Sequence, residues 1–294
     1  MERQIINYSI VDVFSEGKYT GNPLAVFKNA GNLSDIEMQQ IAKEINYSET
    51  TFIVSESKNN NYDVRIFTPK EEIPFAGHPA LGTAYVIQNE ILTKRVEKIT
   101  LNFKGGLIPV TFNPQEGVIW MKQNEPAFGR ILDAHHVLDV LNIAKEDLDG
   151  RYPVQEVSTG LPVIIVPLKS LEGVKKVRLN REKYFELIDQ TEAKAIMVFA
   201  PETYHSVNDL NVRDFAAYYG IPEDPATGSS NGCLAAYLVK YRYFENNKIN
   251  VRVEQGYEIE RPSLLFLEAS DDSGIIKVHV GGKVVKIAQG EWFV

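Results

Sequence analysis

The sequence predicts an α+β fold built from two similar halves, and three observations support this prediction. Two glycine-rich turns of the same form, Pro74-Phe75-Ala76-Gly77 and Pro225-Ala226-Thr227-Gly228, occur far apart in the chain. Each turn leads into an apolar stretch suited to a buried helix, at 83–87 and at 233–239. The strand and helix signals that precede each turn also follow one another in the same order. These matches predict an internal duplication, and two equivalent halves would enclose a cleft of the kind in which small ligands bind.

The first half contains two predicted helices and a set of short strands. The first helix begins at Ser34, where Glu37 three residues later completes a capping box, and it ends near Asn46. The second helix follows the glycine turn and ends near Asn89. Strands are predicted where apolar and β-branched residues cluster between turn signals, at 4–14, 24–27, 48–54, 62–67, 98–103, 107–112 and 117–121.

The second half repeats this order after a connector near 124–130 and a helix at about 133–143. Thr159-Gly160-Leu161-Pro162 corresponds to Thr20-Gly21-Asn22-Pro23, and Asn180 can cap the next helix. Further strands are predicted at 195–199, 211–215, 250–255, 263–269, 275–280 and 284–289.

The offset between matched positions grows from 139 to 151 residues along the chain, as two copies with loop insertions would give. We expect a first domain over 1–125 and a second domain over 130–283. The C-terminal strand, 284–294, is a candidate addition to the first domain.

Composition and charge exclude several classes of function. The 294 residues carry a formal net charge of −8 without a basic tract, which argues against nucleic acid as a partner. The single cysteine, Cys233, allows no internal disulfide, and the adjacent His135-His136 lack a third ligand for a metal. No Walker loop or dinucleotide fingerprint indicates a nucleotide cofactor. Because no signal pattern or membrane-length apolar run is present, we expect a soluble, cytoplasmic protein.

Six short motifs carry a resemblance to a known family. They are Thr20-Gly21-Asn22-Pro23, Ser48-Glu49-Thr50-Thr51-Phe52, Arg65-Ile66-Phe67-Thr68-Pro69, Pro74-Phe75-Ala76-Gly77-His78-Pro79, Glu223-Asp224-Pro225-Ala226-Thr227-Gly228-Ser229 and Glu254-Gln255-Gly256. On these motifs the chain resembles, essentially from end to end, the PhzF family of phenazine-biosynthesis-like proteins. The Ala-Gly-His-Pro and Asp-Pro-Ala-Thr-Gly-Ser signatures are specific in combination.

This resemblance implies a diaminopimelate-epimerase-like fold. Its two similar domains would be related by a pseudo-two-fold axis, each a curved, barrel-like sheet around a central helix, with the active site between them. It also implies a cofactor-independent isomerase that forms a homodimer. By the same resemblance Glu49 is the proton-transferring acid/base, and His78 and Asp224 assist it. Gly77 and Ser229 would help to hold the substrate.

The residues themselves allow both a functional and an ordinary interpretation of each acidic position. Glu49 lies between a predicted helix and an apolar strand, where a partly desolvated carboxyl group can act as a general acid/base. The alternative is a solvent-facing glutamate in a loop. Asp12, Glu71 and Glu72 are interpreted as ordinary surface charges.

His78 and Asp224 each stand beside a predicted helix start. His78 can shuttle a proton or bond a carboxylate, or it can simply cap its own helix. Asp224 precedes Pro225 and is therefore held extended. It can orient the substrate or His78, or it can interact with the helix dipole, for about 0.3–1 kcal/mol.

The glycine turns suggest how an anionic substrate would be held. Gly77, Gly228 and Ser229 would supply backbone N–H donors to a substrate carboxylate, the alternative being turns needed only for tight packing. In the epimerases that the chain resembles, the places of Ala76 and Thr227 carry two cysteines. Neither is cysteine here, which excludes a two-thiol racemase, and we expect Cys233 to be a small core residue.

The two halves differ at the proposed base. Glu49 has no acidic counterpart near Ala193-Lys194-Ala195. A single base suits an isomerisation that takes a proton from one carbon of a small anionic metabolite and returns it to another carbon. The alternatives are an epimerase, in which Glu49 and either Asp224 or His78 act from opposite faces, and a non-catalytic metabolite-binding protein.

Overall fold

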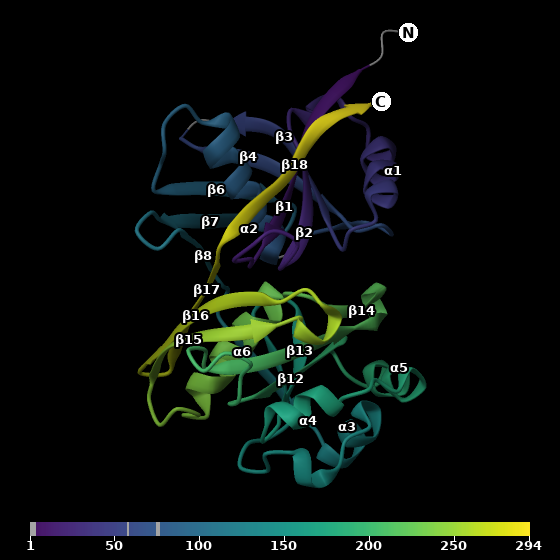
Figure 1. The fold of residues 1–294 in the computed structure, drawn as a ribbon, viewed down its shortest axis with the longest axis vertical. Coiled ribbons are helices and arrows are strands. Elements are labelled where there is room, and N and C mark those ends of the chain that lie inside the picture. The colour runs from purple at the N-terminus through teal and green to yellow at the C-terminus, as the bar shows by residue number, and fades with distance from the viewer. Residues whose placement is uncertain (1–3, 58, 75–76) are drawn as a thin grey trace. The chain divides into compact units, whose positions relative to one another are not determined.

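The computed structural model describes residues 4–57, 59–74 and 77–294, and its chain divides into two compact units (Figure 1). Unit 1 comprises Met1–Lys122 and Gly281–Val294, and unit 2 comprises Gln123–Val280. Each unit combines curved strands with one long helix that is buried along most of its length. The described part of the chain holds no helix long and apolar enough to cross a membrane.

Unit 1 places β1 between two antiparallel neighbours, β2 and β18, while β2 and β3 run parallel. Its strands are β1 (Ile5–Val13), β2 (Asn22–Phe27), β3 (Thr50–Ser57), β4 (Asn61–Phe67), β5 (Glu72–Ile73), β6 (Lys98–Phe103), β7 (Gly106–Asn113), β8 (Val118–Lys122) and β18 (Val284–Phe293). Its helical elements are η1 (Ala30–Asn32), α1 (Asp35–Ile45), α2 (Gly77–Val86) and the π-helical turn η2 (Ile87–Ile91). The predicted capping box of α1 is confirmed, since Ser34 and Glu37 bond each other's backbone N–H groups.

Unit 2 repeats this arrangement and adds helices. Its strands are β9 (Ala127–Ile131), β10 (Gln155–Ser158), β11 (Pro162–Pro167), β12 (Ala195–Ala200), β13 (Leu210–Ala216), β14 (Ile221–Asp224), β15 (Lys248–Gln255), β16 (Ser263–Asp272) and β17 (Ile275–Gly282). Its helical elements are α3 (Ala134–Leu141), η3 (Lys145–Asp147), α4 (Leu171–Lys176), α5 (Arg181–Asp189), η4 (Ala217–Tyr219), α6 (Gly228–Lys240) and η5 (Tyr257–Ile259).

The strand pairings show the duplication directly. The parallel pairs β2–β3 and β4–β6 of unit 1 correspond to β11–β12 and β13–β15 of unit 2. In the hairpin before the central helix, Arg65 donates two hydrogen bonds to the Glu72 carboxylate, at 2.8 and 3.0 Å. Arg213 binds the Glu223 carboxylate in the same way, at 2.8 and 2.7 Å. The predicted α+β class with two similar halves is therefore confirmed.

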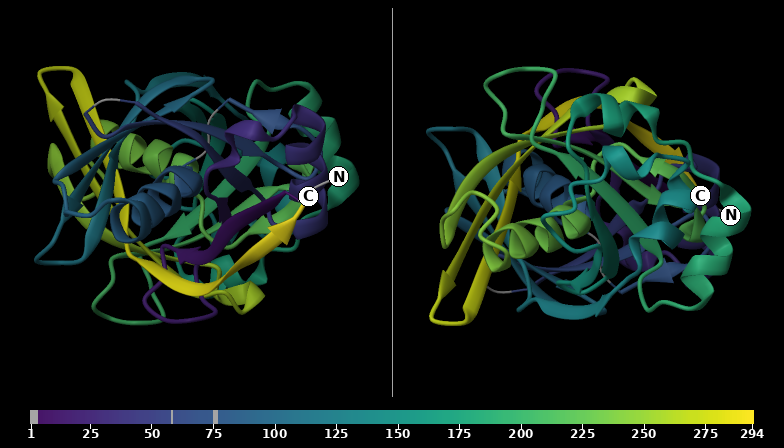
Figure 2. Two further views of the ribbon diagram at one scale, coloured as in Figure 1. Left: turned by 90° about the horizontal axis from the view of Figure 1, so that it is seen from above. Right: turned by 90° about the horizontal axis from the view of Figure 1, so that it is seen from below.

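Each central helix is enclosed by strands of its own unit. Figure 2 shows α2, in blue, and α6, in light green, inside their curved strands. The helix α2 packs against β1, β2, β3, β6, β7, β8 and β18, and α6 packs against β10, β11, β15 and β16. Gly82 lets α2 approach closely, because a Cβ there would lie 2.6 Å from a Leu24 methyl group and 2.9 Å from a Val13 methyl group.

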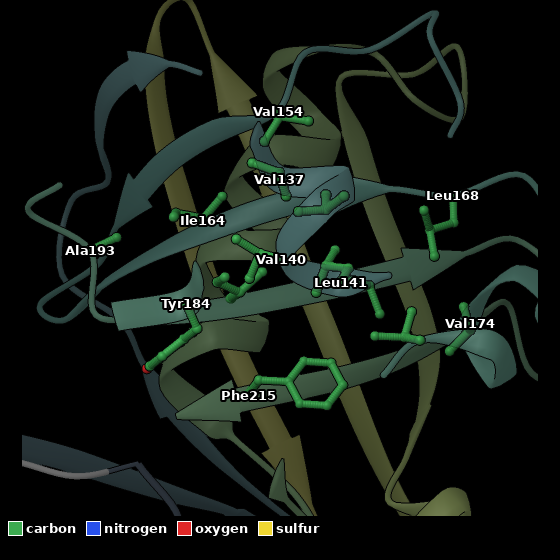
Figure 3. Close-up of a cluster of buried hydrophobic side chains, with 14 of the residues drawn as sticks. Val137, Val140, Leu141, Val154, Ile164, Leu168, Val174, Tyr184, Ala193 and Phe215 are labelled. Atoms are coloured by element: carbon green, nitrogen blue, oxygen red, sulfur yellow. The ribbon is translucent and has the colours of Figure 1, made fainter. Parts of the chain in front are cut away.

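A second apolar layer covers the other face of the unit 2 strands. Alternate residues of a strand point to opposite faces, so Phe199 contacts the Tyr237 ring of α6 while its neighbour Val198 points away. Figure 3 shows the resulting cluster, in which residues of α3, α4 and α5 pack against β11, β12 and β13. Tyr184 is a fully buried member of it.

Three expectations from the sequence are wrong in detail. The segment near 124–130 is not only a connector, because Ala127–Ile131 forms β9 and pairs with β10 despite its mostly exposed side chains. Asp12 is not a surface charge: it is buried in β1 and accepts a 2.8 Å hydrogen bond from the Tyr19 backbone N–H. Glu72 is half-buried by its bonds to Arg65.

Candidate active site

In unit 1 the predicted residues His78 and Glu49 lie side by side. His78 is the second residue of α2, it is buried, and its ring hydrogen-bonds the backbone of Pro23. Because proline has no N–H, the bond must run from a ring N–H to the Pro23 carbonyl oxygen. Among the described residues the His78 Nε2 atom has no hydrogen-bond partner, which assigns the donated proton to Nδ1. The Nε2 atom lies 3.6 Å from Oε2 of Glu49.

The surroundings keep the imidazole of His78 neutral. Burial lowers its pKa from 6.5 to about 3, although the hydrogen bond to Pro23 opposes part of this shift. At neutral pH the lone pair of Nε2 therefore faces the Glu49 carboxyl group. The 3.6 Å separation is longer than a hydrogen bond, so the two groups are adjacent without being locked together. Nε2 is thus placed to accept a hydrogen bond from Glu49 when that carboxyl group carries a proton.

The local sequence holds Glu49 at the entry to β3. The C-cap of helix α1, Asn46, has the left-handed conformation, and Ser48 donates a 3.3 Å hydrogen bond to the Asn22 side chain. Two residues after Glu49, the hydroxyl groups of Thr51 and Thr83 lie 2.8 Å apart and tie β3 to α2. The Glu49 side chain is 14% exposed and therefore lies in a largely desolvated position.

The Thr20-Gly21-Asn22-Pro23 motif contacts both Ser48 and His78. Gly21 has a φ of 70°, and a Cβ there would lie 2.3 Å from the Val13 carbonyl oxygen, so only glycine fits. This turn sets the Asn22 side chain against Ser48 and the Pro23 carbonyl against His78. Three motifs that lie far apart in the sequence thus meet around one histidine and one glutamate.

In unit 2 Asp224 ends β14 and begins a tightly bonded turn. The Thr227 hydroxyl donates a 2.5 Å hydrogen bond to Oδ2 of Asp224. Gln255 donates to the Asp224 carbonyl at 2.9 Å and to the Thr227 hydroxyl at 3.0 Å, and it accepts from the Thr227 N–H at 3.1 Å. Sequence reasoning flagged Gln255 only as part of a motif. The structure gives it a role, which is to fix the turn that carries Asp224.

The first turn of α6 contains the predicted donors Gly228 and Ser229. Thr227 is the N-cap of this helix, and its side chain bonds Asp224 instead of the helix. The first N–H groups of a helix have no intrahelical acceptor, so those of Gly228 and Ser229 are suited to an anion. Gly77 occupies the corresponding place at the start of α2, whereas Phe75 and Ala76 lie outside the described residues.

The structure brings the predicted residues together in two sets: Glu49, His78 and Gly77 in unit 1, and Asp224, Gly228 and Ser229 in unit 2. The matched strand registers identify the counterpart of Glu49. Ala25 pairs with Thr50, and Ile164, at the matching place of β11, pairs with Ile196. Glu49 therefore corresponds to Ala195, which has no ionisable side chain.

Cys233 takes no part in either set. It is buried in α6, and burial raises the pKa of its thiol to about 12. It is the core residue that the sequence predicts. In the described part of the chain no group of three or more histidine, cysteine, aspartate or glutamate side chains is placed to hold a metal ion.

The structure also reveals a carboxyl group that the sequence analysis missed. Asp214 is fully buried in β13, opposite Asp224, and burial raises its pKa to about 8. The sequence carries a signal for it, because Asn211-Val212-Arg213-Asp214-Phe215 matches Asp63-Val64-Arg65-Ile66-Phe67 and has an acid where that stretch has the apolar Ile66.

Comparison with known proteins first defines the class. The fold is shared with a hydroxyproline epimerase from Agrobacterium vitis, with a TM-score of 0.65 over 99% of this chain and 93% of that chain at 8% identity. The chain is thus of the epimerase-like fold. It belongs to the phenazine biosynthesis-like protein family, PhzC-PhzF, whose family model matches residues 11–290.

Individual relatives extend this assignment. A PhzF-family phenazine biosynthesis protein of Bacillus anthracis superposes with a TM-score of 0.91 at 28% identity, over 99% of this chain and 100% of that chain. An uncharacterized isomerase of Clostridium acetobutylicum is 36% identical over 96% of both chains. The trans-2,3-dihydro-3-hydroxyanthranilate isomerase of Pseudomonas fluorescens is 34% identical over 97% of this chain and 98% of its own. The protein is an isomerase of this family.

Proposed function

We propose that the protein is a cofactor-independent isomerase in which Glu49 transfers a proton on a small carboxylate-bearing substrate. His78 and Asp224 assist, and the N–H groups of Gly77, Gly228 and Ser229 hold the substrate carboxylate. A binding place between the two halves and a homodimeric assembly, both implied by the family resemblance, stay predictions.

The observation that carries this proposal is the pairing of Glu49 with a neutral His78. A base that moves a proton must give it up again, so it needs a neighbour that can stabilise its protonated form without taking the proton away. Burial lowers the pKa of His78 to about 3, so the imidazole does not compete for the proton at neutral pH. Its Nε2 lone pair, 3.6 Å from Glu49, can instead accept a hydrogen bond from the carboxylic acid.

The proposed reaction balances without a co-reactant. The Glu49 carboxylate takes a proton from a carbon of the substrate, and the electron pair of that C–H bond moves to shift a double bond. Glu49 then returns the proton to a different carbon of the same molecule. The backbone donors at the starts of α2 and α6 would stabilise the negative charge carried by the substrate.

An epimerase is the second candidate, and the structure offers it less support. Inversion at one carbon needs an acid and a base on opposite faces. The position that corresponds to Glu49 in unit 2 is Ala195, and the matched turn carries Thr227 where a thiol would be needed. A non-catalytic metabolite-binding protein would not require the paired Glu49 and His78.

The proposal is tested with a Glu49→Gln variant, which keeps the size of the side chain and removes its acid/base function. The first substrate for the assay is trans-2,3-dihydro-3-hydroxyanthranilate, on which the Pseudomonas fluorescens relative is named to act. We expect turnover to fall by about 10²–10⁴-fold while ligand binding is retained. Glu44→Gln, at an exposed position of α1, is the matched control and should behave as the wild type. Unimpaired turnover by Glu49→Gln would end the assignment.

A further inference from the structure

Two buried carboxyl groups face each other beside the first turn of α6. Asp214 of β13 and Asp224 of β14 are directly opposite in the strand register, and both are buried. Residues opposite each other in an antiparallel pair point to the same face, with Cβ atoms about 4.5–5.5 Å apart. The Ser230 hydroxyl of α6 interacts with the Asp214 carboxyl group, but neither carboxylate oxygen makes a well-formed hydrogen bond to a described residue.

The fold does not require acids at these two places. In the matching hairpin of unit 1 the corresponding pair is Ile66 opposite Ile73. The neighbouring arginine–glutamate ion pair is present in both hairpins. Burial of the Asp214 carboxyl group disfavours its charged form, whereas the isoleucine at the matching place of unit 1 contributes to the core. The acid pair of unit 2 therefore needs an explanation other than folding.

Among the described residues that act electrostatically on Asp214, none supplies a positive charge. On β12 its partner in the register is the apolar Met197. Glu223, beside Asp224, is paired with Arg213. Three further described titratable groups interact electrostatically with Asp214, namely Tyr184 of α5, Tyr219 of η4 and Cys233 of α6.

These three neighbours stay neutral near neutral pH. Burial raises the pKa of Tyr184 and of Cys233 to about 12, and it raises the pKa of Tyr219 as well. The Ser230 hydroxyl of α6 offsets only part of the effect of burial on Asp214. The charge that matters most for Asp214 is therefore that of Asp224, directly opposite.

We propose that Asp214 is a positioning residue for Asp224: it keeps a proton near neutral pH, so that Asp224 alone carries the negative charge of the pair. This inference rests on the proposed function, because it takes Asp224 to act in the site. With a single charge, Asp224 keeps its 2.5 Å hydrogen bond from Thr227 and the turn stays in place. When Asp214 loses its proton, two buried carboxylates oppose each other and the turn is displaced.

The consequence is an alkaline limb in the pH profile that belongs to Asp214. Burial, with the negative charges of Asp224 and Glu223, raises the pKa of Asp214 to about 8. The protonated fraction of a group with this pKa falls about tenfold between pH 7 and pH 9. We expect kcat/KM for trans-2,3-dihydro-3-hydroxyanthranilate to fall by about the same factor.

The test compares two variants across this range. Asp214→Asn has nearly the same shape and cannot ionise, so its kcat/KM should change less than about twofold between pH 7 and pH 9. Asp189→Asn removes the same charge from an exposed position at the end of α5 and should keep the alkaline limb of the wild type. An alkaline limb in Asp214→Asn equal to that of the wild type overturns the inference, as does an equal loss of activity at every pH.

A second measurement does not depend on turnover or on the variant. Infrared spectroscopy of the wild-type protein should show the C=O stretch of a protonated carboxylic acid at pH 7 and its loss by pH 9. Absence of this band at pH 7 overturns the inference even if Glu49→Gln is inactive. Conversely, an active Glu49→Gln variant contradicts the proposed function while the infrared band still reports on Asp214.

Discussion

Replacing His78 by asparagine should change how the stability of unit 1 depends on pH. His78→Asn places an amide N–H near the position of the Nδ1–H and so retains a donor for the Pro23 carbonyl, but it cannot take up a proton. In the wild type the pKa of His78 is about 3 in the folded state, against 6.5 for an exposed histidine. Between these values the unfolded chain binds a proton that the folded chain does not. The contribution of the neutral His78 to stability is therefore fully present above pH 6.5 and is lost as the pH falls toward 3.

The size of this loss follows from the unfolded pKa alone as long as the folded pKa is well below the working pH. The pH of 5 is about 1.5 units below the pKa of histidine in the unfolded chain, so proton binding stabilises the unfolded chain by about 2 kcal/mol. The wild type should thus lose about 2 kcal/mol more than His78→Asn between pH 8 and pH 5. Any constant cost of the substitution cancels in this comparison.

Tryptophan fluorescence is a suitable assay because both tryptophans of the chain, Trp120 in β8 and Trp292 in β18, belong to unit 1. Urea unfolding of the wild type and His78→Asn at pH 8 and pH 5 gives the required difference. His136→Asn, at an exposed position of α3, is the matched control and should lose as much stability as the wild type between pH 8 and pH 5. Equal losses in the wild type and in His78→Asn would refute the assignment of a neutral, buried imidazole.

Two further predictions concern packing and ion pairs, each measured by urea unfolding followed by circular dichroism. Gly82→Val should cost about 1–3 kcal/mol. The reason is that a Cβ at Gly82 would lie 2.6 Å from a side chain of β2, whereas a Cβ at Gly150 meets nothing within 4 Å, so Gly150→Ala should be nearly neutral. Arg213→Ala should cost about 3–5 kcal/mol, since it removes the charge that pairs with the buried Glu223 carboxylate and one hydrogen bond from each of two backbone carbonyls. Arg65→Ala should cost about 1 kcal/mol, because that side chain is 25% exposed against 7% for Arg213; equal costs for the two arginines would contradict this reasoning.

Features set by neighbouring residues could be predicted from the sequence. The capping box of Ser34 and Glu37 depends only on residues three apart, and the structure confirms it. The order of motifs revealed the duplication because the two copies kept their turn chemistry. The candidate pair of Glu49 and His78 was reached through motif resemblance, and its 3.6 Å separation required the fold.

Features set by distant pairing could not be predicted in this way. The strand β9 carries little apolar pattern, and it forms because β10, more than 20 residues later, offers free backbone groups to pair with. Asp12 has a carboxyl group and yet is buried, since the loop after β1 brings the Tyr19 N–H to it. Asp214 is an acid within a fully buried strand, and only the register that sets it opposite Asp224 shows why it matters.

Turnover in deuterated water tests the central claim most directly. If one carboxyl group, Glu49, moves hydrogen between two carbons, deuterium from the solvent should enter the product only at the carbon that receives the proton. Recovered substrate should keep its configuration, and Glu49→Gln should show no incorporation. Deuterium at the carbon that lost its proton, together with inverted configuration there, would contradict the account and identify an epimerase.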